Sequence, residues 1–247
     1  MRERHIRVAR TGRYYTLGSA GAHVREVWLV CHGYRQMAGR FLPRFGDLDD
    51  GTRLIVAPEA LSRFYLHDPA TGHGKEVPIG ASWMTREDRE NEITDYVGFL
   101  DGVLDEVLDE VSNEVPDDVP DDIPGEVPEE VSDESGGAIP RVTVLGFSQG
   151  AHTVCRWVVA GEVAVERIIL WGSYLPDDLD LDRGPDRLRS AELILVRGVL
   201  DQFITEEVHA RQEKKLEELG IPFETITHSG GHELDPAVLR QIAGVAD

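Results

Sequence analysis

The stretch RVTVLGFSQG, residues 141–150, decides the fold. Its first five residues form an apolar run of strand length, which is typical of a strand buried on both faces of a parallel sheet. Residues 149–160 follow with apolar side chains at helical spacing and end before Gly161. Between strand and helix, glycines stand two residues to either side of Ser148, where the two backbones pass too close for a Cβ. The stretch therefore predicts a strand, a tight turn that exposes Ser148, and a helix.

Further apolar runs of strand length alternate with helical patterns along the chain, which is the signature of a mostly parallel sheet with helices on both faces. The expected strands are residues 26–31, 53–57, 141–145, 167–171, 193–197 and 223–227, after an N-terminal hairpin of 6–9 with 14–17. The expected helices are 149–160, 205–219, one that starts at Asp235 and Pro236, and one with apolar spacing over 93–108 after a capping-box pattern at Thr85 and Asp88. The length of 247 residues suits a single α/β domain over 1–247.

The acidity of the chain is concentrated in one segment. The formal net charge is −21, yet residues 101–140 alone hold 15 acidic and no basic residues. Valine or isoleucine recurs there every fourth residue, and from Pro116 a proline joins the same register, which excludes a helix. We interpret about 113–137 as an acidic Pro/Val repeat inserted at the surface between a helix and the next strand. The shortage of lysine has two alternative explanations, adaptation to a salt-rich cytoplasm or a genome that favours arginine codons.

Composition excludes several classes of protein. The negative charge disfavours nucleic acid and anionic membrane surfaces as partners. No apolar run approaches the roughly 20 residues of a membrane span, and the charged first ten residues lack a secretory signal, so we expect a cytoplasmic protein. Cys31 and Cys155 are expected to be buried free thiols, and no residues show zinc-ligand spacing. No metal is predicted.

A serine hydroxyl becomes a useful nucleophile only when a base removes its proton and an acid orients that base. Asp201 follows the run LILVR, and His232 follows the run FETIT. Both fall in loops at the carboxyl ends of parallel strands, where functional side chains of such sheets gather. The order Ser148, Asp201, His232 is also that of the α/β-hydrolases. We predict that these three residues form a catalytic triad.

Two other histidines are rival bases. His228 lies closer to its strand, and His209 falls inside a helix, so both fit the role less well than His232. The acidic residues Glu206 and Asp235 are better suited to helix N-termini than to the triad.

An acyl-transfer site also needs donors for the oxyanion. The backbone N–H of Gln149, at a helix N-terminus, is one candidate. The second is the N–H of Tyr34, in the loop after residues 26–31, because Gly33 lets that loop approach closely. His32 is expected to shape the loop.

The chain resembles the phospholipase/carboxylesterase family of α/β-hydrolases, which includes acyl-protein thioesterases. The matching residues are His32-Gly33, Ala57-Pro58, Ser82-Trp83, Gly146-Phe147-Ser148-Gln149-Gly150, Gly198 with Asp201, and Gly231-His232. The resemblance implies an α/β-hydrolase fold, a triad of Ser148, Asp201 and His232, an oxyanion hole near Tyr34 and Gln149, and no cofactor. Arg35 and Gln36 depart from the family pattern, which often continues His-Gly-x-Gly-Asp.

Two stretches, 57–66 and 80–88, are candidates for the border of the substrate pocket. Apolar walls are expected from Phe64, Trp83 and Met84, and contacts to an anionic head group from Arg63 or Arg86. The alternative is that the aromatic side chains belong to the core and that the arginines pair with neighbours such as Glu87.

These features predict a serine esterase that cleaves carboxylic esters or thioesters of small molecules through an acyl-enzyme, as a monomer or homodimer. Lysophospholipase or acyl-protein thioesterase activity is the alternative within this class. A non-catalytic binding protein on a hydrolase scaffold, with the acidic repeat as its contact surface, is the alternative from another class.

Overall fold

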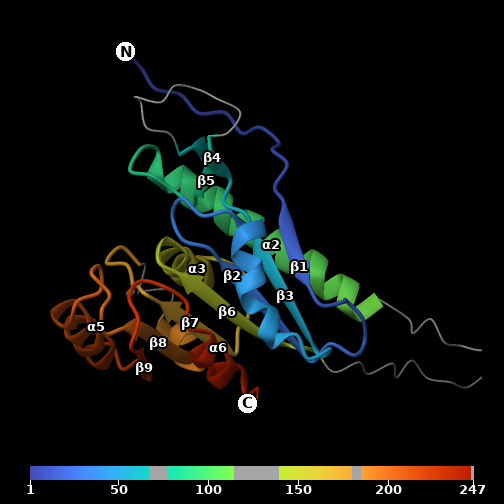
Figure 1. Cartoon of the computed structure of the whole chain (residues 1–247). Coiled ribbons are helices and arrows are strands. Elements are labelled where there is room, and N and C mark those ends of the chain that lie inside the picture. Colours follow the sequence, from blue (N-terminus) through green and yellow to red (C-terminus); the bar gives the residue numbers. More distant parts are fainter. Residues whose placement is uncertain (67–76, 114–138, 180–184, 246–247) are drawn as a thin grey trace, which may run out of the picture.

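The computed structural model describes residues 1–66, 77–113, 139–179 and 185–245. These residues form a seven-stranded sheet in the order β1-β3-β2-β6-β7-β8-β9 (Figure 1). Neighbouring strands are parallel except β1 and β3, so the predicted mostly parallel sheet is confirmed. The strands are β1 (Tyr14–Leu17), β2 (Glu26–Cys31), β3 (Arg53–Pro58), β6 (Arg141–Phe147), β7 (Arg167–Trp171), β8 (Glu192–Gly198) and β9 (Glu224–His228).

Both faces of the sheet are apolar and both are covered by helices. In β2, Val27 and Leu29 belong to one buried cluster while Trp28 and Val30 belong to another, as the alternation of side chains along a strand requires. The first cluster packs under α2 (Arg89–Asn113), α3 (Gln149–Ala160), α4 (Pro185–Ser190) and α5 (Glu206–Glu218). The second packs under α1 (Ala38–Phe41), the 3-10 helix η1 (Leu42–Leu48) and α6 (Pro236–Ala243). In Figure 1, α2 passes behind β1 and β3.

The predicted N-terminal hairpin is wrong. β1 lies antiparallel to β3, and residues 6–9 are not a strand. Ile6 and Val8 are largely exposed. The physical reason is that residues 6–9 bury none of their side chains, so no apolar burial offsets the entropy cost of ordering them beside β1.

The predicted capping box is also wrong. The helix α2 begins at Arg89, after Asp88, which has a positive φ of 49° and therefore cannot be a residue of the first helical turn. The Thr85 hydroxyl accepts a hydrogen bond from the N–H of Glu87 (3.1 Å) and forms a local turn.

A second, two-stranded sheet was not predicted. It pairs β4 (Ser62–Tyr65) with β5 (Ile79–Ser82) in antiparallel fashion. The Arg35 N–H donates to the Ala81 carbonyl (2.9 Å), and the Ala81 N–H donates to the Gln36 carbonyl (3.0 Å). This small sheet therefore supports the loop that follows β2.

Most of the predicted acidic insertion at about 113–137 lies outside the described residues, and a single domain over 1–247 stays a prediction. Cys31 and Cys155 are buried free thiols, as expected, and burial raises the pKa of Cys155 to about 12. None of the helices in the described ranges has the length and apolar composition of a membrane-spanning segment.

Candidate active site

Ser148 lies on a strained turn between β6 and α3. Its φ of 54° and ψ of −118° are rare for a residue with a side chain. A Cβ on Gly150 would lie 2.1 Å from the Cys31 carbonyl oxygen, and a Cβ on Gly146 would lie 2.3 Å from the Ala151 Cα. The two glycines are therefore required by the packing of β6, α3 and β2, as the sequence predicts.

Asp201 and His232 are joined by a hydrogen bond. The loop after β8 carries Asp201 and the loop after β9 carries His232, and the distance from His232 Nδ1 to Asp201 Oδ2 is 2.7 Å. The carboxylate is buried. Its second oxygen, Oδ1, accepts the backbone N–H groups of Phe203 (2.8 Å) and Ile204 (3.1 Å). One oxygen thus holds its own loop in shape while the other orients the imidazole.

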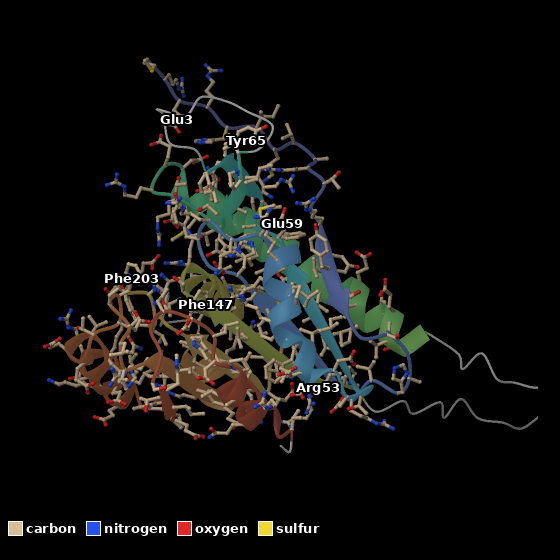
Figure 2. The ribbon with its side chains drawn as sticks, in the orientation of Figure 1. Glu3, Arg53, Glu59, Tyr65, Phe147 and Phe203 are labelled. Atoms are coloured by element: carbon tan, nitrogen blue, oxygen red, sulfur yellow. The ribbon has the colours of Figure 1, made fainter. Side chains whose placement is uncertain are left out.

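The His232 ring lies beside the residue that precedes Ser148. Its centroid is 4.9 Å from that of Phe147 and 4.8 Å from that of Phe203; both phenylalanines are labelled in Figure 2. Phe203 meets the imidazole edge to face and remains 60% exposed. The ring is thereby held by apolar contacts as well as by its hydrogen bond to Asp201.

The end of β7 connects the serine to the histidine. The Ser148 N–H donates to the Trp171 carbonyl (2.9 Å). The next residue, Gly172, has a φ of 59°, and a Cβ there would lie 3.0 Å from atoms of the His232 ring. Because β7 lies between β6 and β8, the imidazole has to reach past this strand, and the glycine makes the room.

The loop after β2 approaches the serine closely. A Cβ on Gly33 would lie 3.2 Å from the Ser148 Cβ. The Gly33 N–H donates to the Gln36 side chain (2.8 Å). In the described parts of the chain, the backbone N–H groups of Tyr34 and Gln149 have no hydrogen-bond acceptor. Both predicted oxyanion donors are therefore available on either side of Ser148.

The buried side chain of His32 holds this loop in shape. It is fully buried, its Nε2 accepts the Ala60 N–H (3.1 Å), and its Nδ1 lies 2.8 Å from the Gly33 carbonyl oxygen. These partners require the neutral tautomer with the proton on Nδ1. Burial lowers the pKa of His32, which keeps that neutral form.

Trp83 belongs to the core, and the cavity that it borders lies between the N-terminal segment and α2, with no lining residue from Ser148, Asp201 or His232. Its indole N–H donates to the His32 carbonyl (2.8 Å), and its ring packs against the rings of His32 and Tyr96. Its backbone N–H donates to the Gln149 side chain (3.1 Å), whose amide N–H donates in turn to the Met84 carbonyl (2.9 Å). The Gln149 side chain thus links the turn at Ser148 to residues 83 and 84.

The other predicted pocket residues divide into two groups. Phe64 stacks on Tyr34, with ring centroids 5.5 Å apart, and so borders the loop after β2. Arg63 forms an ion pair with the buried Glu59 (3.2 Å) rather than with Glu87.

Met84 is partly buried, and its sulfur lies 3.7 Å from the Arg156 guanidinium. Arg86 is exposed.

The rival bases are engaged elsewhere. His209, on α5, lies 3.2 Å from Glu213 on the same helix. His228 ends β9, is buried, and accepts the Gly230 N–H (3.2 Å).

The sequence reasoning missed one polar pair at this end of the sheet. His152 lies one helical turn after Ser148, and its Nε2 is 3.1 Å from the Ser173 hydroxyl. No local sequence pattern predicts this pair, because it joins α3 to a loop 21 residues away.

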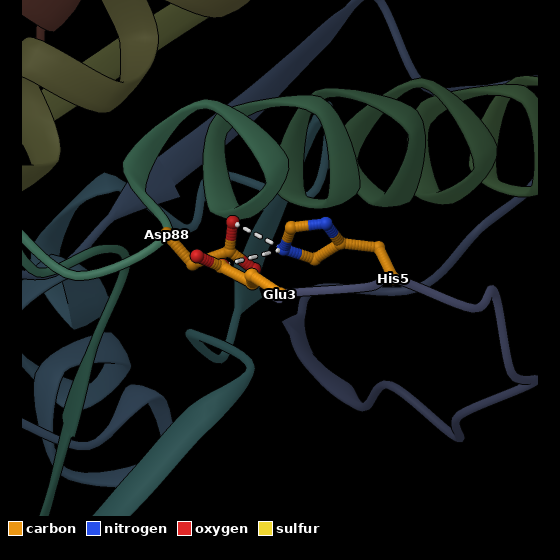
Figure 3. A group of neighbouring side chains, drawn as sticks. All are labelled: Glu3, His5 and Asp88. Atoms are coloured by element: carbon orange, nitrogen blue, oxygen red, sulfur yellow. Dashed lines mark ion pairs between the residues drawn. The ribbon is translucent and has the colours of Figure 1, made fainter. Parts of the chain in front are cut away.

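A possible metal-binding group lies apart from this site (Figure 3). The His5 Nε2 is 3.1 Å from a carboxylate oxygen of Glu3 and 3.1 Å from one of Asp88, and all three side chains are exposed. We interpret these contacts as surface ion pairs that connect the N-terminal segment to the start of α2.

No family model matches this sequence, and no curated protein matches it either. Solved structures do match. An acyl-protein thioesterase 2 from Zea mays is 14% identical with a TM-score of 0.61, over 95% of this chain and 97% of that one. A carboxylesterase from Mesorhizobium loti is 16% identical with a TM-score of 0.62, over 94% of each chain. A carboxylesterase from Bacillus cereus is 14% identical with a TM-score of 0.59, over 94% of this chain and 92% of that one. The predicted resemblance is confirmed at the level of the fold: this chain has the α/β-hydrolase fold that these esterases and thioesterases share.

Proposed function

We propose that the protein is a serine hydrolase that cleaves carboxylic esters or thioesters through an acyl-enzyme. The observation that carries the proposal is the strained turn at Ser148, which lies at the same end of the sheet as the hydrogen-bonded pair of Asp201 and His232. The fold shared with solved carboxylesterases supports it.

Each residue has a role in the proposed reaction. The Ser148 hydroxyl attacks the acyl carbon while His232 accepts its proton, and Asp201 holds the imidazole in the tautomer that exposes Nε2. The N–H groups of Tyr34 and Gln149 stabilise the oxyanion of the tetrahedral intermediate. His232 then protonates the leaving alcohol or thiol. A water molecule, with His232 again as base, attacks the acyl-enzyme and releases the acid.

A second candidate within the same chemistry is a lysophospholipid or acyl-protein thioester as substrate. The observation that favours it is the set of apolar side chains exposed around the site, namely Tyr34 (52%), Leu200 (74%) and Phe203 (60%). Exposed apolar groups at the mouth of a site favour substrates with an alkyl chain.

The proposal is tested by hydrolysis of p-nitrophenyl esters from acetate upward, with the wild type beside Ser148→Ala. Ser190→Ala is a matched control, because Ser190 is exposed on α4 and its hydroxyl donates only to the Arg187 carbonyl of that helix. We expect activity in the wild type and in Ser190→Ala, and its loss in folded Ser148→Ala. Equal rates in all three proteins, or no hydrolysis of any ester or thioester, contradict the proposal and favour a binding role.

A further inference from the structure

His152 and Ser173 form a polar pair that the proposed reaction does not use. His152 projects from α3 and Ser173 from the loop after β7, and the distance from His152 Nε2 to the Ser173 Oγ is 3.1 Å. The Tyr174 ring meets the imidazole edge to face, with centroids 4.9 Å apart. All three side chains are only partly buried. The pair therefore retains surface through which it can contact a ligand.

This pair adjoins the proposed nucleophile and base. His152 lies in the first turn of α3, the helix that begins directly after Ser148. Ser173 follows Gly172, where a Cβ would lie 3.0 Å from the His232 ring. The residue before that glycine, Trp171, accepts the Ser148 N–H. A substrate bound at Ser148 and His232 would have this pair as its neighbour.

The loop that carries Ser173 is fixed in place. Asp178 accepts the Arg156 guanidinium (2.8 Å) from α3 and forms a second ion pair with Arg89 from α2. Asp177 forms an ion pair with Lys215 from α5 (2.9 Å). These ion pairs connect residues 177 and 178 of the loop to three helices, which favours a preorganised position for the neighbouring Ser173.

The pair is uncharged at neutral pH. Burial lowers the pKa of His152 and the nearby Arg156 lowers it too, while Asp178 and Asp177 act in the opposite direction; together they bring the pKa to about 4. A neutral imidazole holds one proton on its two nitrogens, and the serine hydroxyl that meets it keeps hydrogen-bonding capacity of its own. Such a pair suits a neutral oxygen better than a carboxylate or an ammonium group.

We propose that His152 and Ser173 form a polar subsite that hydrogen-bonds an uncharged oxygen substituent of the substrate, a hydroxyl, ether or carbonyl oxygen close to the scissile bond. The inference rests on the proposed function. It adds a substrate class: esters that carry such an oxygen are preferred over alkyl esters of the same length, because an alkyl group there leaves the pair without a partner.

Two pairs of esters of equal length test the subsite. On the acyl side, p-nitrophenyl methoxyacetate is compared with p-nitrophenyl butyrate. On the alcohol side, 2-methoxyethyl butyrate is compared with butyl butyrate. The readout is the ratio of kcat/KM for the oxygenated ester to kcat/KM for the alkyl ester, measured in the wild type, His152→Leu and Ser173→Ala. Because the same two esters are used throughout, differences in their intrinsic reactivity cancel between proteins.

We expect this ratio to fall about tenfold in both variants, in the acyl arm or in the alcohol arm, which is the loss of one neutral hydrogen bond. The double variant should fall no further than either single one, since the two residues act as a unit. His152→Gln, which keeps a hydrogen-bonding group, should recover part of the ratio. Thermal unfolding of each variant establishes that it is folded.

Ratios that stay within twofold of the wild type in both arms, in active variants, overturn the subsite and leave the proposed function standing. Absence of hydrolysis that depends on Ser148 removes the proposed function instead, and the subsite with it. The two failures are therefore distinct. A purely structural role for His152 would change both rates together and leave the ratio as it was.

Discussion

Asp201 has a separate task for each of its carboxylate oxygens, and two substitutions separate them. Oδ2 orients His232, and Oδ1 accepts the N–H groups of Phe203 and Ile204. In Asp201→Asn, the amide oxygen can still accept both N–H groups, but an NH₂ group then faces the imidazole and stabilises the wrong tautomer. In Asp201→Ala, both tasks are lost.

The size of each effect follows from these contacts. A hydrogen bond to a charged acceptor contributes about 1 kcal/mol more than one to a neutral acceptor, so Asp201→Asn should cost about 2 kcal/mol of unfolding free energy over two bonds. Asp201→Ala removes the bonds altogether and should cost about 4 kcal/mol. For a chain of this size, 1 kcal/mol lowers Tm by about 2–4 °C, which gives a loss of about 4–8 °C and about 8–16 °C respectively. The wrong tautomer in Asp201→Asn, and the loss of any partner for Nδ1 in Asp201→Ala, should each lower kcat by about 10³–10⁴.

The assay pairs thermal unfolding with kcat for one p-nitrophenyl ester. The expected pattern is equal loss of activity but unequal loss of Tm, with alanine the more destabilising. Equal Tm values for the two variants would refute the task assigned to Oδ1. A kcat within tenfold of the wild type in Asp201→Asn would refute the task assigned to Oδ2.

Three further outcomes are expected. Gly150→Ala should lower the yield of folded protein, because its Cβ would lie 2.1 Å from a backbone oxygen. Gly98→Ala on α2 should raise the unfolding free energy by about 0.5–1 kcal/mol, because nothing lies within 4 Å of its Cβ. Urea unfolding compares the two variants. Because the pKa of folded His152 lies below its unfolded value of about 6.5, stability should fall as pH drops from 6.5 toward 4, and His152→Leu should reduce the loss between pH 7 and 5 by up to about 2 kcal/mol in urea titrations. Replacing residues 114–138 by a short Gly/Ser linker should leave the rate of ester hydrolysis within a few fold of the wild type. The reason is that the segment joins the chain just before the start of β6, whereas Ser148 follows the opposite end of that strand. Loss of hydrolysis in a folded variant would contradict this.

Much of the sheet could be predicted because its strands are buried on both faces. Runs such as LILVR are apolar on both faces of the strand, so their composition alone identifies them as strands. The observed β8 is longer than the expected 193–197 by one residue at each end. The turn at Ser148 could also be predicted, because two close backbone approaches leave a clear glycine pattern. The pairing of Asp201 with His232 follows from the carboxyl ends of parallel strands meeting at one edge.

What could not be predicted depends on contacts between distant segments. Residues 6–9 alternate like a strand, but a strand forms only where other segments cover its apolar side chains, and here all four residues are exposed. The β4–β5 pairing lies across a long connection with no two-residue turn signal. The contact of His152 with Ser173 joins α3 to a loop 21 residues away, and no local sequence pattern predicts it.

The place of β9 at the rim of the sheet has a consequence for how activity responds to stress. Among the described residues β9 pairs with β8 alone, and His232 lies just beyond it, whereas Ser148 follows a strand flanked on both sides. Outer strands open at a lower free energy than central ones. Mild heat or urea would therefore release the proposed base while the nucleophile stays in position, and catalysis would stop, reversibly, well before the core of the protein melts.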